Sequence, residues 1–75
     1  TIPFEASVSQ NIRIAVFDPS GKLVRILTDR HFAPGRHQVL WNGRDMAGRM
    51  AGSGVYFARL TAGRDRSVLK LILLR

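Results

Sequence analysis

Apolar and polar residues alternate along most of the chain, a period of two that predicts β-strands with one face toward a core. In the first segment, Ile2, Phe4 and Ala6 alternate with Pro3 and Glu5. Because proline has no N–H to donate to a ladder, we expect this first strand at a sheet edge or near its start. No segment has the 3.6-residue apolar period of a helix. The predicted strands comprise residues 2–8, 12–16, 23–27, 37–41, 55–60 and 68–74.

Turn signals separate these segments at roughly the spacing expected of sandwiches and barrels. Asp18-Pro19-Ser20-Gly21 carries the residues preferred at successive positions of a tight turn and predicts a hairpin. Pro34-Gly35 suits a type II turn, and Asn42-Gly43 ends a strand before the glycine-studded connection of residues 44–54. The sequence therefore predicts an all-β domain, and it shows no internal repeat.

The last predicted strand is apolar on both sides. Such a strand is expected to be central in its sheet or covered on both faces. If both faces are covered within the chain, removal of residues 71–75 should abolish folding. If a face or edge is open, the domain should self-associate or accept a strand from another chain. One face holds Leu69, Leu71 and Leu73, and the other Val68, Ile72 and Leu74.

Length and composition limit the chain to a single domain over residues 1–75 with one modest core. The absence of cysteine excludes disulfides and thiolate metal sites. The longest apolar run, residues 71–74, is far too short to span a bilayer. The first residues lack the features of a signal peptide and include no initiator methionine, so we expect a fragment or a processed product.

A formal net charge of +7, from 12 Lys and Arg against 5 Asp and Glu, raises the question of an acidic partner such as nucleic acid. The basic residues are scattered singly along the chain, without a run or a helical stripe. That distribution is typical of solvated strand faces and loops. We therefore predict no specific nucleic-acid binding, and at most a weak, sequence-independent affinity for polyanions.

No set of residues suggests catalysis, a cofactor or a metal. Ser53 lacks the glycines two residues to either side that a nucleophile elbow needs, because these positions hold Ala51 and Val55. His31 and His37 have no acidic or thiol neighbour at ligand spacing. Asn42 and Asp45 superficially resemble the start of a calcium loop, but one carboxylate falls short of the six to eight oxygens that calcium takes. We therefore predict that the domain is not an enzyme and that these Asn and Asp residues stabilise turns.

The aromatic residues allow two interpretations. Trp41, Tyr56 and Phe57 could form a stacking platform for bases or sugars. Trp41 shares its strand face with Val39, however, which favours a core tryptophan, so Trp41→Ala is expected to cost about 3–5 kcal/mol. Phe57 lies on the opposite strand face from Tyr56, so one of these faces meets a covering sheet.

Two motifs in combination carry a family resemblance. Trp41-Asn42-Gly43-Arg44-Asp45, followed at this distance by Ser53-Gly54-Val55-Tyr56-Phe57, resembles the immunoglobulin-like domain of the flagellar hook-capping protein. It also resembles related domains, the C-terminal sorting domains of type IX secretion cargo. Further matching segments are residues 12–24, 33–37 and 48–49 and Leu60. The segment similar to the closing strand of the family is Lys70-Leu71-Ile72-Leu73-Leu74-Arg75.

The resemblance implies a small immunoglobulin-like antiparallel β-sandwich of six to seven strands, in which Trp41, Asp45, Gly54 and Tyr56 serve the core and turns. It also implies a non-catalytic C-terminal module of a larger secreted or cell-surface bacterial protein. The expected partners are proteins of the secretion or assembly machinery and the upstream domain. Two functions stay open under this resemblance: sorting and surface attachment through the last strand, or assembly of an extracellular filament or hook-cap-type complex, with self-association through strand edges. Weak, non-specific polyanion binding is the lesser third alternative.

Overall fold

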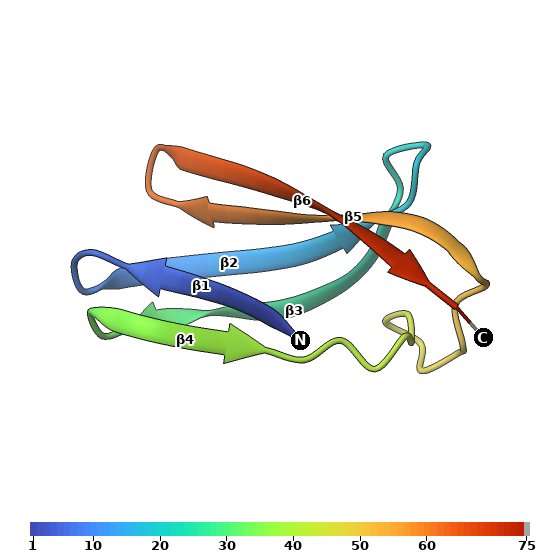
Figure 1. Ribbon diagram of the computed structural model, residues 1–75, viewed down its shortest axis with the longest axis horizontal. Coiled ribbons are helices and arrows are strands. Elements are labelled where there is room, and N and C mark those ends of the chain that lie inside the picture. Colours follow the sequence, from blue (N-terminus) through green and yellow to red (C-terminus); the bar gives the residue numbers. More distant parts are fainter. Residues whose placement is uncertain (75) are drawn as a thin grey trace.

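Six β-strands joined by turns and one long loop make up the computed structural model, which describes residues 1–74 (Figure 1). All six predicted strands are present. Within the described residues there is no helix, and so no helical segment that could cross a membrane. The strands are β1 (Ile2–Ala6), β2 (Gln10–Phe17), β3 (Leu23–Phe32), β4 (Gly35–Val39), β5 (Gly54–Ala62) and β6 (Asp65–Leu73).

The strands form two antiparallel sheets that face each other as a sandwich. β1 pairs with β4 in a two-stranded sheet, and the larger sheet has the order β3-β2-β5-β6. In Figure 1 the β1–β4 pair lies over β2 and β3, with β5 and β6 to one side. The all-β sandwich is therefore confirmed. So is the edge position of Pro3, because each strand of a two-stranded sheet is an edge.

The core lies between the two sheets and is centred on β2. Ile12, Ile14 and Val16 are the largest fully buried side chains. From the small sheet, Ile2 and Phe4 point inward, in the alternating burial that the sequence predicted for β1. Burial of this kind is worth roughly 1.5–3 kcal/mol for each large aliphatic or aromatic side chain. The packing of β1 across β2 is therefore the main support of the fold.

β3 is longer than the sequence indicated. The predicted strand ended at residue 27, whereas β3 runs on to Phe32 through a polar stretch. Pairing with β2 holds this stretch extended, and Asn11 Nδ2 donates to Asp29 Oδ1 at 2.9 Å across the two strands. Phe32 then packs edge-to-face on Phe4, with the ring centroids 5.1 Å apart. A cross-strand ladder and one buried aromatic residue thus extend a strand that lacks an apolar alternation of its own.

The prediction that the last strand is central or covered is wrong. β6 is the outer strand of the larger sheet and pairs with β5 alone. The division of its faces is as predicted, because Leu71 packs against the core while Val68 and Ile72 are 64% and 67% exposed. The physical reason is the size of the small sheet, since two strands cannot cover both sides of a four-stranded neighbour. Of the two outcomes considered for the last strand, the second therefore applies: one edge and one face of β6 are open.

Candidate interaction surface

The β5–β6 hairpin sets the direction of every backbone group on β6. Its loop has two residues, Gly63 and Arg64, between the paired Ala62 and Asp65. Gly63 has a φ of 62°, and none of the described non-glycine residues, Arg64 included, has a positive φ, which is the pattern of a type II′ turn. The pair that closes such a loop is hydrogen-bonded, and bonded and non-bonded pairs then alternate along the ladder. The backbone of Asp65 is therefore hydrogen-bonded to β5, and so is the backbone of every second residue that follows it in β6.

The remaining residues of β6 turn their N–H and C=O groups away from β5. They are Arg66, Val68, Lys70 and Ile72, and their backbone groups form the free side of the sheet. Their side chains share the outer face of the sheet, because they pair with Thr61, Arg59, Phe57 and Val55 and not with the buried positions of β5. We call these four residues of β6, with their free backbone groups, the β6 edge.

The β6 edge alternates cationic and apolar side chains. Arg66 and Lys70 are exposed, and Val68 and Ile72 stand between and beside them. No carboxylate lies on the outer face of β5 or β6 within the described residues, since Asp65 points to the other side. An exposed strand edge with these side chains can bind another extended chain by backbone hydrogen bonds and by charge.

The predicted recognition segment is residues 70–75, and its successive side chains up to Leu73 lie on opposite faces of β6. Lys70 and Ile72 belong to the β6 edge, whereas Leu71 and Leu73 point toward the interior and are partly buried. Leu74 follows the end of β6 and is exposed. Arg75 lies outside the described residues. The structure thus separates the residues of this segment that stabilise the domain from those that a partner could reach.

An open, mainly apolar groove of about 370 Å³ lies between β1 and β6 on the inner side, and its lining also includes Glu5, whose carboxylate pairs with Arg36 at 3.3 Å. Ile2 and Phe4 line it from β1, and Leu69 lines it from β6. Leu69 is 48% exposed because nothing in the described chain covers the inner side of β6 at this point. The groove therefore continues the apolar surface of β6 around to the inner face of the sheet.

Trp41 lies just beyond β4 and is partly buried, so it is not the centre of the core. Its ring packs against the ring of Tyr56, which is buried. Trp41 Nε1 donates to the carbonyl of Arg44 at 3.0 Å, and the Tyr56 hydroxyl donates to the carbonyl of Gly52 at 2.6 Å. The two rings thereby hold both ends of the long loop between β4 and β5. A free stacking platform is not formed, because Phe57 lies on the outer face, away from this pair.

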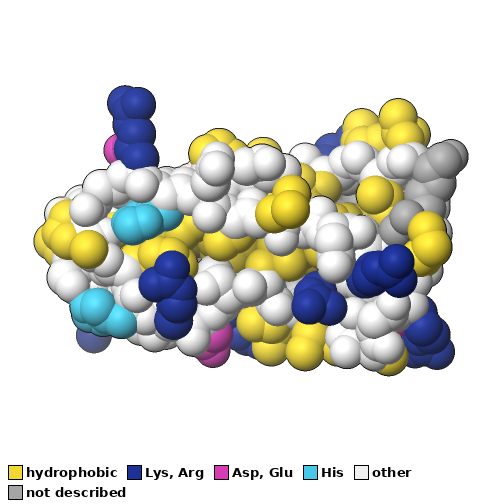
Figure 2. Space-filling model, turned by 90° about the horizontal axis from the view of Figure 1, so that it is seen from below, with side chains coloured by type: hydrophobic (Ala, Val, Ile, Leu, Met, Phe, Trp, Pro, Cys, Tyr) yellow, Lys and Arg dark blue, Asp and Glu magenta, His cyan; other side chains and the backbone are white. Residues whose placement is uncertain are grey.

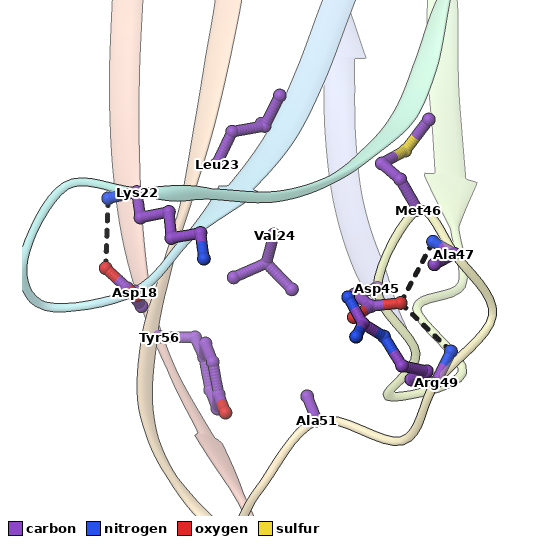
Figure 3. Close-up of a pocket in the computed structure, with 10 residues that line it drawn as sticks. All are labelled: Asp18, Lys22, Leu23, Val24, Asp45, Met46, Ala47, Arg49, Ala51 and Tyr56. Carbon is purple, nitrogen blue, oxygen red and sulfur yellow. Dashed lines mark hydrogen bonds and ion pairs between the residues drawn. The ribbon is translucent and has the colours of Figure 1, made fainter.

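Asp45 organises that loop in the same way as Asp18 organises the β2–β3 turn (Figure 3). Asp18 Oδ1 accepts hydrogen bonds from the backbone N–H groups of Ser20 and Lys22, at 3.0 and 2.9 Å. Asp45 Oδ1 accepts from the N–H groups of Ala47 and Arg49, both at 2.9 Å. The sequence shows no longer internal repeat, yet both loops read Asp-x-x-Gly followed by Lys or Arg. Five residues are too few for this signal to stand out in the sequence.

These bonds stabilise the charged form of both carboxyl groups. The pKa of Asp18 is lowered, first by its hydrogen bond from the Ser20 side chain and then by the backbone N–H of Lys22. The pKa of Asp45 is lowered chiefly by the backbone N–H of Arg49, whose guanidinium also lies 3.2 Å from Asp45 Oδ2. The turn role predicted for Asp45 therefore has a structural basis in the hydrogen bonds that its carboxylate accepts from the loop backbone.

A hollow of about 350 Å³ opens between these two loops, with Tyr56 and Val24 between Asp18 and Asp45 (Figure 3). Both carboxylates bond their own loops, and the described residues hold no group of three or more His, Cys, Asp or Glu side chains that could bind a metal. The hollow thus offers neither a nucleophile with a base nor a ligand cluster. Its walls come from the two loops and from the adjoining strands β3 and β5.

The remaining candidates are structural in their contacts. His37 stacks on Phe4, with centroids 5.5 Å apart, and its Nε2 lies 2.7 Å from the carbonyl oxygen of Ala33. His31 Nε2 lies within hydrogen-bond distance of the Ser9 hydroxyl. Gly54 begins β5 with a φ of 154°, an angle that side chains rarely adopt. Figure 2 shows basic side chains at separate places on one face, without a single basic cluster there.

Comparison with known families matches residues 3–66 to the FlgD Ig-like domain. Comparisons with curated proteins and with solved structures gave no match. The matched span runs from β1 into the start of β6, so Val68, Lys70 and Ile72 lie beyond it. It supports the flagellar part of the resemblance, and type IX sorting stays a prediction. Since the match covers most of its length, this chain belongs to the FlgD Ig-like domain family, a structural and non-enzymatic domain of the flagellar hook-capping protein.

Proposed function

We propose that the chain is a single non-catalytic assembly module of a larger secreted or cell-surface protein, and that it joins this protein to protein partners through the β6 edge. The observation that carries the proposal is the exposure of Val68 and Ile72 on a strand with free backbone groups. Natural proteins usually blunt such edges, and an edge left open pairs with other chains. Family membership supports an assembly role over a catalytic one.

Sorting and surface attachment is the second candidate function. It is favoured by the exposure of Lys70 and Ile72, because both belong to the segment that resembles the closing strand of sorting domains. In this case an export machine would bind the folded sandwich and its last strand. Both functions use the same surface, so they differ in the step at which the parent protein needs it.

Cross-linking from the β6 edge tests the shared surface. A photoreactive amino acid replaces Val68 in the parent protein, and in a matched variant it replaces Val8, which is 57% exposed in the β1–β2 turn. We expect cross-links to a protein of the same extracellular structure from position 68 and none from position 8. Equal cross-linking from the two positions would contradict a specific role of β6.

The variant Val68→Pro separates the two functions. Proline removes one free N–H of the edge without removing a bond to β5. A parent protein that is exported but missing from the extracellular structure indicates assembly, whereas one retained in the cell indicates sorting. Normal export together with normal incorporation would contradict both functions.

A further inference from the structure

The four open strand edges of the sandwich differ in their ability to bind a strand. β1 carries Pro3 as its second residue, and both β1 and β4 are only five residues long. The start of β3 is covered by the long loop, where the N–H of Met46 donates to the carbonyl of Val24 at 3.1 Å and Arg25 donates to the carbonyl of Asp45 at 2.9 Å. The pairing of β3 with β2 also has two register shifts. These edges are therefore short, interrupted, or irregular and covered at the start, and such features hinder strand addition.

β6 has none of these three features, and its edge is hindered only by the charged side chains of Arg66 and Lys70, which disfavour a basic strand more than an acidic one. It is nine residues long, contains no proline, and pairs with β5 without a register shift. Its free N–H and C=O groups belong to Arg66, Val68, Lys70 and Ile72, which present them at every second residue. A strand added here extends the larger sheet by a regular ladder.

The charge of the β6 edge defines the chemistry of that strand. In an antiparallel pair, side chains directly opposite each other lie about 4.5–5.5 Å apart, and opposite charges there are favourable while like charges are not. Arg66 and Lys70 have no carboxylate near them on the outer face, within the described residues. We infer that the β6 edge binds an extended, amphipathic segment of a partner protein, with acidic side chains opposite Arg66 and Lys70. This inference rests on the assembly role proposed above.

The apolar residues complete the pattern. On the outer face, Val68 and Ile72 need apolar partners, because they are the exposed large side chains of the edge. On the inner face, side chains of the added strand meet Leu69 at the mouth of the groove that Ile2 and Phe4 line. From its N-terminus, an antiparallel partner strand therefore reads apolar, apolar, acidic, apolar, apolar, polar, acidic, with the first residue opposite Ile72.

A second copy of this chain fits the edge poorly. Pairing β6 with itself brings together two chains of net charge +7. It also places two copies of Arg66 and Lys70 on one continuous face to which neither β6 nor β5 contributes a carboxylate. An acidic strand neutralises the same charges, so charge complementarity favours a different protein over a second copy.

Two peptides test the inference. The acidic probe is Val-Ile-Glu-Val-Ile-Thr-Glu, and the control Val-Ile-Lys-Val-Ile-Thr-Lys differs only at the two charged positions. Binding to the purified domain is measured by fluorescence anisotropy and by the shifts of backbone amide NMR signals at several salt concentrations. We expect the acidic peptide to bind about tenfold more tightly at low salt, with the largest shifts on β6, because two cross-strand pairs change sign between the peptides.

Two charge variants serve as a matched pair. Lys70→Glu and Lys22→Glu lower the net charge equally, but only Lys70 belongs to the β6 edge. The first variant should lose the preference for the acidic peptide, and the second should keep it. Equal loss in both variants would show that net charge alone attracts the peptide and would overturn the inference.

Backbone pairing is tested separately with Val68→Pro. If this variant binds neither peptide while the wild-type domain binds both equally, the β6 edge is a docking strand and the acidic class of partner is wrong. If the wild-type domain binds neither peptide and sediments as a dimer, the partner is a second copy. If it binds neither and stays monomeric, both this inference and the docking role of β6 are contradicted.

Discussion

The ring of Trp41 packs edge-to-face on the ring of Tyr56, with centroids 5.1 Å apart and planes at 70°. One ring comes from the segment that follows β4 and the other from β5, so the contact joins the two strands on either side of the long loop. Their hydrogen bonds to the carbonyls of Arg44 and Gly52 attach the same rings to the loop itself. This pair therefore positions the loop that carries Asp45.

Replacement of Trp41 should destabilise the domain less than a fully buried tryptophan would. We expect Trp41→Ala to cost about 2–3 kcal/mol, below the ~3–5 kcal/mol typical of core Trp→Ala changes, because the ring is only partly buried. Tyr56→Phe removes a single hydrogen bond and should cost roughly 0.5–1.5 kcal/mol. Urea unfolding monitored by circular dichroism measures both changes, and equal losses would show that the aromatic contact contributes little.

The glycines of the two Asp-x-x-Gly loops should resist substitution for a backbone reason alone. Gly21 and Gly48 have φ angles of 90° and 82°, and a Cβ at either position meets no atom within 4 Å. Alanine there should cost roughly 1–2 kcal/mol, the usual cost of a left-handed backbone with a side chain. Gly52→Ala is the control, because that site is equally open and has no such φ. A loss at position 52 as large as at the other two would refute the explanation.

The stability of the domain should fall on acidification through the same two loops. The pKa values of Asp18 and Asp45 are lower in the folded chain than their usual value of 3.8. The unfolded state therefore binds more protons in this range, so the contribution of both groups is present above about pH 4 and is lost as the pH falls through the folded pKa values.

The pH dependence can be assigned with a double variant. Asp18→Asn with Asp45→Asn keeps an oxygen that accepts the backbone N–H bonds but removes the titration. We expect its melting temperature to lie below that of the wild type near neutral pH and to approach it at about pH 2. Parallel melting curves for the two proteins over the whole pH range would show that these carboxyl groups do not carry the effect.

The alternation of apolar residues predicted all six strands because each inward side chain of β1, β2 and β5 meets the core directly. The alternation failed where pairing with neighbouring strands determines the structure. Residues 28–32 of β3 are mostly polar, and their strand depends on pairing with β2, which no local pattern encodes. The two apolar faces of β6 indicated a central strand, but its position follows from the order of strands in the sheet.

The candidate surface was only partly predictable for the same reason. The sequence identified the segment around Lys70 and Ile72 through a resemblance, and the alternation placed Ile72 on the opposite face from Leu71 and Leu73. It could not tell which of the two faces is open. That assignment needs the register with β5, which depends on the two-residue turn at Gly63. Val68 begins the last strand that the sequence predicted as relevant to partners. Arg66 was not predicted as part of the surface, because a single cation on a strand is common to many solvated edges.

Leu71 and Ile72 are neighbours on opposite sides of one strand, so they distinguish stability from recognition. Leu71 packs against the core, and Leu71→Ala should cost about 2–3 kcal/mol, toward the lower end for core leucines because the side chain is partly buried. Ile72 is 67% exposed, and Ile72→Ala should change the stability by less than about 0.5 kcal/mol. Ile72→Ala should instead weaken binding of the acidic peptide, and it should do so more than Leu71→Ala does in the folded fraction, because the Leu71 side chain is partly buried. Thermal melts and peptide titrations on the same two samples measure both quantities. A stability loss at Ile72 equal to that at Leu71 would mean that the outer face of β6 is covered in solution, and the β6 edge would then not be open to a partner strand.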